Sequence, residues 1–200
     1  MDVEKELRAL RLFLEAEARL WEYSYAQKIV NEPSGFNLSW DQDEGLSSTR
    51  SGPEGESIDA YVLTLRLFIQ NNERVSIGNT TKNVEALFAK GIITKEQHDA
   101  WMEAREHLNK FLDSDTYLSV NKTPLSNRHV LDTVVYGGYA HYDERKRREL
   151  DSWKKIPSLF DMVMNEFVNI TGRMNYWLHG MRGLVEEVVA EIERRQSSAR

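Results

Sequence analysis

The last quarter of the chain carries an apolar seam that constrains the fold more than any other feature of the sequence. From Phe160 onward, large apolar side chains recur at alternating steps of four and three residues. The members of the seam are Phe160, Met164, Phe167, Thr171, Met174, Leu178, Met181, Val185, Val188 and Ile192. This spacing places all of them on one side of an α-helix, as in packed long helices and coiled coils. It predicts one long helix that begins just after Pro157, where Ser158 and Asp161 form a start signal.

The rest of the chain supplies helices that can pack against this seam. A second apolar stripe predicts that the first thirty residues form one helix, which ends before Pro33. Its members are Val3, Leu7, Leu10, Leu14, Ala18, Trp21, Tyr25 and Ile29. Shorter helices are predicted over 57–73, 83–91, 94–114 and 127–139. Only 116–120, the short run TYLSV, reads as a strand.

The predicted fold is therefore all-α: a bundle of five to seven helices, framed by long N- and C-terminal helices. With 200 residues, the chain is of the right size for one domain over 1–200. Residues 33–56 are rich in Gly, Ser, Pro and acidic side chains. A loop of this length is unusual in a compact domain. We expect a flexible excursion there, and a lid anchored by Trp40 is the alternative.

Composition removes several classes of function. Cysteine is absent, which excludes thiolate catalysis, disulfides and Cys-ligated zinc. Neither a His-x₃-His pair nor an H-E-x-x-H helix occurs, and we expect no metal and no cofactor. The charged N-terminus and the lack of a long apolar run predict no secretory signal and no membrane span, so we expect a cytoplasmic location. The net charge of −6 disfavours a general nucleic-acid coat but leaves a local basic face open.

One charged residue stands inside an otherwise apolar helix. Arg66 lies in the middle of the run YVLTLRLFI, whose apolar residues point in nearly every direction. A helix of this kind is central, and a charge within it is costly to bury unpaired. Arg66 either extends its head to the surface, or pairs with a carboxylate such as Asp132 or Glu166, or grips a phosphate or carboxylate in a cleft.

The stretch VVYGGYAHYDERKRREL, at 134–150, concentrates the remaining chemical groups. Its two glycines predict either a close helix–helix crossing or a left-handed helix end. Both leave His141 at or just past a helix terminus beside Asp143, where an imidazole can act as general acid or base. The alternative is that His141 and its tyrosine neighbours make hydrogen bonds between helices. The basic run that follows is either a solvated face or a set of RNA contacts: Arg145, Lys146, Arg147 and Arg148.

A second pattern resembles a known superfamily. Arg173 is followed six positions later by His179 in the segment RMNYWLH. An arginine followed after four to six residues by histidine, within an all-α bundle, is similar to the signature of the HEPN superfamily. That resemblance implies metal-independent RNA cleavage or, in inactive members, partner binding. His179 would then deprotonate the 2′-hydroxyl and Arg173 would stabilise the developing phosphorane charge.

These observations leave two main functional hypotheses, and a helical bundle that binds a small ligand or a metal is a third. The first is a dimeric, HEPN-like helical protein that binds or cleaves RNA, since the wide seam leaves room for self-association. In a version of it where helices converge, His141 acts with Arg66 and Arg145 in place of His179 and Arg173. The second hypothesis is a non-catalytic helical interaction module with an unknown partner.

Overall fold

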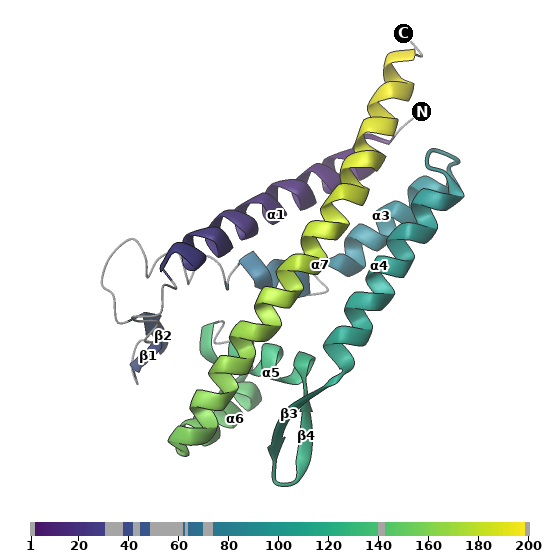
Figure 1. The fold of residues 1–200 in the computed structure, drawn as a ribbon. Coiled ribbons are helices and arrows are strands. Elements are labelled where there is room, and N and C mark those ends of the chain that lie inside the picture. The colour runs from purple at the N-terminus through teal and green to yellow at the C-terminus, as the bar shows by residue number, and fades with distance from the viewer. Residues whose placement is uncertain are drawn as a thin grey trace. The chain divides into compact units, whose positions relative to one another are not determined.

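The structure, a computed structural model, describes residues 3–30, 38–41, 45–48, 62, 64–69, 74–139 and 143–198. Most of these residues are helical (Figure 1). The helices are α1 (Glu4–Val30), α3 (Ile77–Ala89), α4 (Lys95–Asp113), α5 (Asn127–Val134), the π-helix η1 (Val135–Tyr139), α6 (Glu144–Lys154) and α7 (Pro157–Ser198). Residues 64–69 are helical as well. The predicted all-α class with long first and last helices is confirmed.

The C-terminal helix is continuous. α7 runs for 42 residues, which at about 1.5 Å per residue gives a length of roughly 60 Å. Pro157 occupies its first position, where a missing N–H is tolerated. Every seam residue is buried except Phe160, which is half-buried. The seam therefore lines the core of its own chain, and dimerisation through it stays a prediction.

The first helix forms as predicted, but its buried face differs from the predicted stripe. Over its first five turns the buried apolar residues are Leu7, Leu10, Phe13, Ala16 and Leu20. Steps of three residues turn this face gradually around the helix, because three residues span less than one full turn. The ring of Phe13 is held edge-on by Phe68, with centroids 5.3 Å apart, and by Trp101 at 5.9 Å. Trp21, predicted to be buried, is 38% exposed.

Two antiparallel hairpins interrupt the helices. β1 (Leu38–Asp41) pairs with β2 (Gly45–Ser48), and β3 (Asp115–Val120) pairs with β4 (Thr123–Ser126). The strand predicted at 116–120 is confirmed. The prediction that only 116–120 forms a strand is wrong, because β1 and β2 pair within the predicted loop over 33–56. Cross-strand pairing can form a hairpin without the period-two pattern used to predict strands. The flexibility of that loop stays a prediction. The remainder of that loop lies outside the described residues.

Two helices begin at the start signals predicted from sequence, and a third begins at a cap that was not predicted. Thr94 and Gln97 form the predicted capping box before α4, with reciprocal N–H to side-chain bonds of 3.0 and 3.2 Å. The Ser126 hydroxyl accepts from the backbone N–H of His129 at the start of α5, as predicted. α3 begins at Ile77, earlier than predicted, because Ser76 caps it by accepting from the Asn79 N–H.

The chain groups into two compact units. Unit 1 comprises Met1–Trp21, Thr64–Leu108 and Tyr176–Arg200, and unit 2 comprises Glu22–Leu63 and Asn109–Asn175. In unit 1 the Trp101 indole N–H donates to the Thr81 hydroxyl at 3.0 Å. The core of unit 2 includes Val130, Leu131, Leu150, Trp153, Val163 and Ile170. A single domain over 1–200 stays a prediction.

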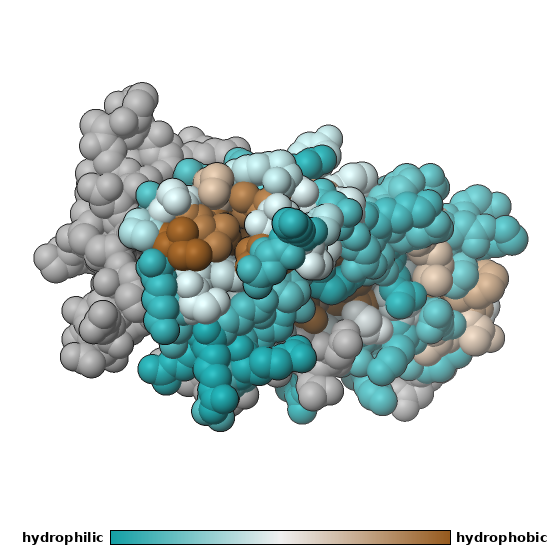
Figure 2. Space-filling view, turned by 90° about the horizontal axis from the view of Figure 1, so that it is seen from below, coloured by the Kyte–Doolittle hydropathy of each residue, from teal (hydrophilic) through white to brown (hydrophobic). Residues whose placement is uncertain are grey.

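The coloured part of the face seen in Figure 2 is mostly hydrophilic, and a cluster of hydrophobic side chains stands out on it. In unit 2 the exposed large hydrophobic residues are Tyr117, Ile156, Met162 and Val168. Within the described ranges, no helix has both the length and the apolar character needed to cross a bilayer.

Candidate functional site

Arg66, on the helix predicted over 57–73, and His141, in the stretch 134–150, are two of the predicted catalytic residues. Arg66 is half-buried in the helical residues 64–69 of unit 1. Its pairing with Asp132 or Glu166, and its role in a cleft, stay predictions. His141 lies outside the described residues, so its role as acid or base also stays a prediction.

The two residues of the HEPN-like pattern contact different parts of the structure. The Arg173 guanidinium lies over the ring of Phe111, 4.7 Å from its centroid, in unit 2. His179 belongs to unit 1, where its Nδ1 is 3.1 Å from Oε1 of Glu17. On continuous α7, six residues separate the two side chains by about 120° around the axis. They do not converge on one point of the α7 surface.

Glu17 is a charged residue of unit 1 whose side chain is buried. Its side chain is only 2% exposed, and its second oxygen accepts from Arg182 at 2.7 Å. The hydrogen bond from Arg182 satisfies the buried charge, as a desolvated carboxylate requires. The ring of His179 stacks on Trp21, with centroids 4.4 Å apart. A buried carboxylate that holds one imidazole nitrogen is the arrangement that orients a general base. His179 as a base stays a prediction.

The basic run of α6 does not form one cationic face. Lys146 is buried, 9% exposed, and its ammonium donates to the Thr133 hydroxyl at 3.2 Å. Arg145, Arg147 and Arg148 are exposed, and Arg148 forms a salt bridge with Glu144. Consecutive residues of a helix point about 100° apart, so a contiguous run must divide between core and surface.

α5, η1 and α6 enclose a polar cluster at the glycine stretch. His129 Nε2 lies 2.6 Å from Glu149 Oε1, and Lys146 lies 3.9 Å from the other oxygen of Glu149. A Cβ at Gly137 would be 2.7 Å from the backbone oxygen of Lys146. The first alternative for the glycines, a close helix crossing, is therefore present at Gly137. π-helices occur often at functional sites, so this region is a second candidate.

The carboxyl of Asp132 on α5 is a titratable group of the same region. Burial raises the pKa of its carboxyl above the ordinary value, and the nearby charges of Lys146, Arg128 and His129 act in the opposite direction. Desolvation disfavours the ionised form more than these cations favour it. The charged groups here are engaged mainly with each other.

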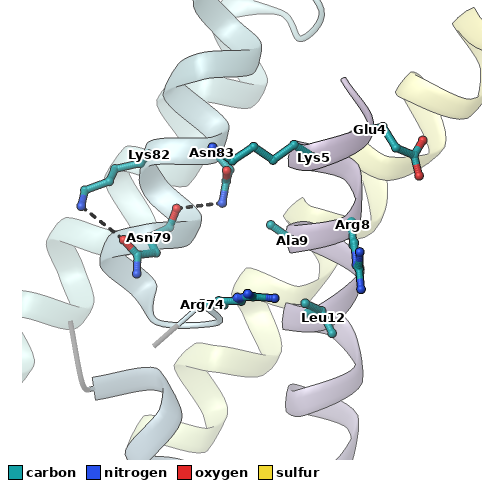
Figure 3. A pocket seen from close by; sticks show the side chains of 9 residues that line it. All are labelled: Glu4, Lys5, Arg8, Ala9, Leu12, Arg74, Asn79, Lys82 and Asn83. Carbon is teal, nitrogen blue, oxygen red and sulfur yellow. Dashed lines mark hydrogen bonds between the residues drawn. The ribbon is translucent and has the colours of Figure 1, made fainter. Parts of the chain in front are cut away.

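Unit 1 contains a third candidate site, in which charged side chains line a hollow. We call it the basic pocket. It is a hollow of about 730 Å³ lined by Glu4, Lys5, Arg8, Ala9, Leu12, Arg74, Asn79, Lys82 and Asn83. Figure 3 shows Lys5 extending from α1 toward Asn83 of α3, Arg74 pointing toward Leu12, and Glu4 on the side of α1 away from α3. Its volume lies within the range of about 300–1,000 Å³ that is usual for ligand sites.

The cations of the basic pocket are exposed and mostly unpaired. Within the part of the chain that the structure describes, Lys5, Arg8 and Arg74 form no salt bridge. By contrast, Arg11 of the same helix pairs with Glu193 at 2.7 Å. Lys82 donates to the Asn79 side chain at 3.2 Å. The lining of this hollow thus contains four cations and one carboxylate, and this excess of positive charge attracts anions.

Local structure explains how these residues meet. Lys5 and Arg8 lie one turn apart in the first turns of α1, on neighbouring positions of its surface. Asn79, Lys82 and Asn83 lie one turn apart on α3, and the Asn83 amide donates to the Asn79 carbonyl at 2.9 Å. Arg74 precedes the Ser76 cap of α3, which fixes the direction in which the chain enters that helix.

Sequence reasoning missed the basic pocket. Its lining residues come from two segments about seventy positions apart, and neither segment contains a run of basic residues. The available signal was the helical spacing of Lys5 with Arg8 and of Asn79 with Lys82 and Asn83. That spacing would have identified two polar faces without showing that they share a hollow.

Comparison with known proteins identifies no relative: no family model, no curated protein and no solved structure matches the chain. Among the residues with described positions, no three His, Asp or Glu side chains converge as a metal ion would require. The chemistry of the molecule must therefore be inferred from its own side chains.

Proposed function

We propose that this protein binds RNA through the basic pocket. The observation that carries the proposal is that Lys5, Arg8, Arg74 and Lys82 line one hollow, with three of them outside any salt bridge to a described carboxylate. Cations in this setting bind phosphates and release condensed counterions. The amides of Asn79 and Asn83 add neutral donors and acceptors that suit phosphate oxygens and ribose hydroxyls.

The charge of the whole chain shapes this proposal. A net charge of −6 repels a polyanion at a distance, so attraction must come from the pocket itself. Binding is therefore local and decreases steeply with added salt. The HEPN-like pattern in α7 supports the same ligand class, because RNA is the substrate that the resemblance implies.

The first experiment measures binding by the full chain. A fluorescently labelled single-stranded RNA of about 12 nucleotides is titrated with protein at about 0.1 M salt, and anisotropy is recorded. We expect a dissociation constant on the order of 10⁻⁶–10⁻⁴ M for the wild type, weakened roughly tenfold by Arg74→Glu. Arg147→Glu, an exposed residue of α6, is the matched control with the same charge change. Absence of binding by the wild type, or equal weakening by both variants, overturns the proposal.

We further propose that the protein cleaves the RNA it binds, and cleavage is measured in the same samples. EDTA inhibits contaminating nucleases that depend on metal ions. Any cleavage of the RNA strand in its presence therefore comes from metal-independent chemistry. If the HEPN-like roles hold, His179→Ala abolishes scission while RNA binding and helicity by circular dichroism stay unchanged. Scission that survives His179→Ala removes that residue from the role of base.

A second candidate function is self-association as an interaction module. Ile156, Met162 and Val168 of unit 2 are large apolar side chains that are 53%, 42% and 42% exposed. Exposed apolar side chains that gather in one patch mark interaction surfaces. Light scattering tests this role. A dimer that becomes a monomer in Val168→Asp supports it, and a wild-type monomer at roughly tens of micromolar removes it.

A further inference from the structure

A second hollow adjoins the basic pocket in unit 1. It has a volume of about 350 Å³ and is lined by Gly78, Asn79, Thr81, Lys82, Glu85 and Arg105. Asn79 and Lys82 line both hollows, so the two are neighbours across the N-terminal half of α3. Figure 3 shows Lys82 directed away from α1, on the side of α3 opposite Lys5. The basic surface therefore continues from α1, over α3, to Arg105 of α4.

Arg105 extends the series of available cations. It is half-buried, and among described residues it takes part in no salt bridge. Glu85 is the single carboxylate of the second hollow, against the charges of Lys82 and Arg105. The first turn of α3 adds the partial positive charge of a helix N-terminus beside Gly78. The charges along this path thus favour an extended anion over a compact one.

The side chains that line both hollows also limit how a nucleic acid can be recognised. None of the lining residues, all of which lie in described ranges, has an aromatic ring. Base stacking, which usually carries recognition of single strands, has no platform here. What remains is contact with phosphates and sugars, which positions a strand without reading its bases.

We propose that the ligand is one flexible RNA strand whose sugar–phosphate backbone crosses α3. This inference rests on the proposed function. Its phosphates occupy the basic pocket, pass Lys82 and end at Arg105. A flexible strand can enter two small hollows in succession. A double helix is a rigid rod that carries its phosphates on the outside, and it cannot follow such a path.

The test compares oligonucleotide length with charge reversal in the full chain. Oligouridylates from about 3 to about 12 nucleotides, an oligoadenylate of about 12 and a duplex of the same length are titrated by anisotropy. For the wild type we expect affinity to rise with length and then level off, with U and A equal within about threefold and the duplex weaker. Arg105→Glu should weaken the longest strand roughly tenfold and level off at a shorter length.

Lys110→Glu supplies the matched control, because Lys110 lies on the same helix and the charge change is the same. Circular dichroism confirms that each variant is folded. The inference is overturned if Arg105→Glu binds the long strand as the control does, if the duplex binds more tightly, or if U and A differ by more than about tenfold. Failure of the wild type to bind any RNA is a different result, which removes the proposed function itself.

Discussion

The basic pocket of unit 1 and the basic run of α6 each bring together four cations, in opposite settings. The cations of the pocket come from two distant segments, and Lys5, Arg8 and Arg74 are exposed and outside salt bridges to described carboxylates. The basic run is contiguous, but Lys146 is buried in a hydrogen bond and Arg148 is paired with Glu144. Charge density along a sequence is therefore a poor guide to charge density in space. Burial takes Lys146 away from any ligand, whereas the cations that line the hollow remain available to one.

The comparison predicts its largest effect in RNA affinity. We expect Arg8→Glu with Arg74→Glu to weaken binding roughly 100-fold, because two phosphate contacts become two repulsions. Arg145→Glu with Arg147→Glu, which reverses the two exposed members of the basic run that form no salt bridge with a described residue, should change the affinity less than about threefold. Anisotropy titrations at one salt concentration measure both. A larger loss in the α6 variant would transfer the binding site to the basic run.

The next effect concerns stability and tests the close crossing in unit 2. Gly137→Ala should lower the free energy of unfolding by about 1–3 kcal/mol, because its Cβ would meet the Lys146 carbonyl. Gly172→Ala is the control, since a Cβ there meets no atom within 4 Å. It should stabilise α7 by about 0.5–1 kcal/mol through helix propensity. Urea denaturation gives both values. Equal effects would mean that α6 does not approach Gly137 closely.

A similar contrast holds within the basic run itself. Lys146→Ala leaves the Thr133 hydroxyl and the Glu149 carboxylate without their ammonium neighbour, and we expect a loss of about 1–2 kcal/mol. Arg147→Ala, one position along and exposed, should change stability by less than about 0.5 kcal/mol. RNA affinity should respond to neither variant. Thermal melts and binding titrations on the same preparations separate the two readouts.

The smallest effect is a pH dependence from Asp132. Burial raises the pKa of this carboxyl in the folded state, so its ionised form lowers stability at neutral pH. Asp132→Asn removes that cost, and we expect the variant to be more stable than the wild type at about pH 7. The gain should shrink as the pH falls through the folded pKa toward the ordinary value of 3.8. Denaturation at a series of pH values measures it, and a gain independent of pH would contradict the raised pKa.

Much of the fold follows from local rules that sequence makes visible. The capping box of Thr94 and Gln97, the Ser126 cap and the alternating steps of the α7 seam all act over a few neighbouring residues. Prediction was wrong where distant residues decide the outcome. Pairing of β1 with β2 and the exposure of Trp21 depend on which segments meet in space. The prediction for His141 lies outside the described residues and stays open.

By itself the sequence determined that this chain would be helical, with one uninterrupted rod at its C-terminal end, because hydrophobic periodicity and helix caps are short-range properties. Tertiary structure alone decided which charged side chains remain available to bind a ligand. Lys5, Arg8, Arg74 and Lys82 form a site only because α1 and α3 lie side by side, and Lys146 is lost from the surface only because α6 packs on α5. Electrostatic attraction depends on distances through space, and sequence separation does not specify them.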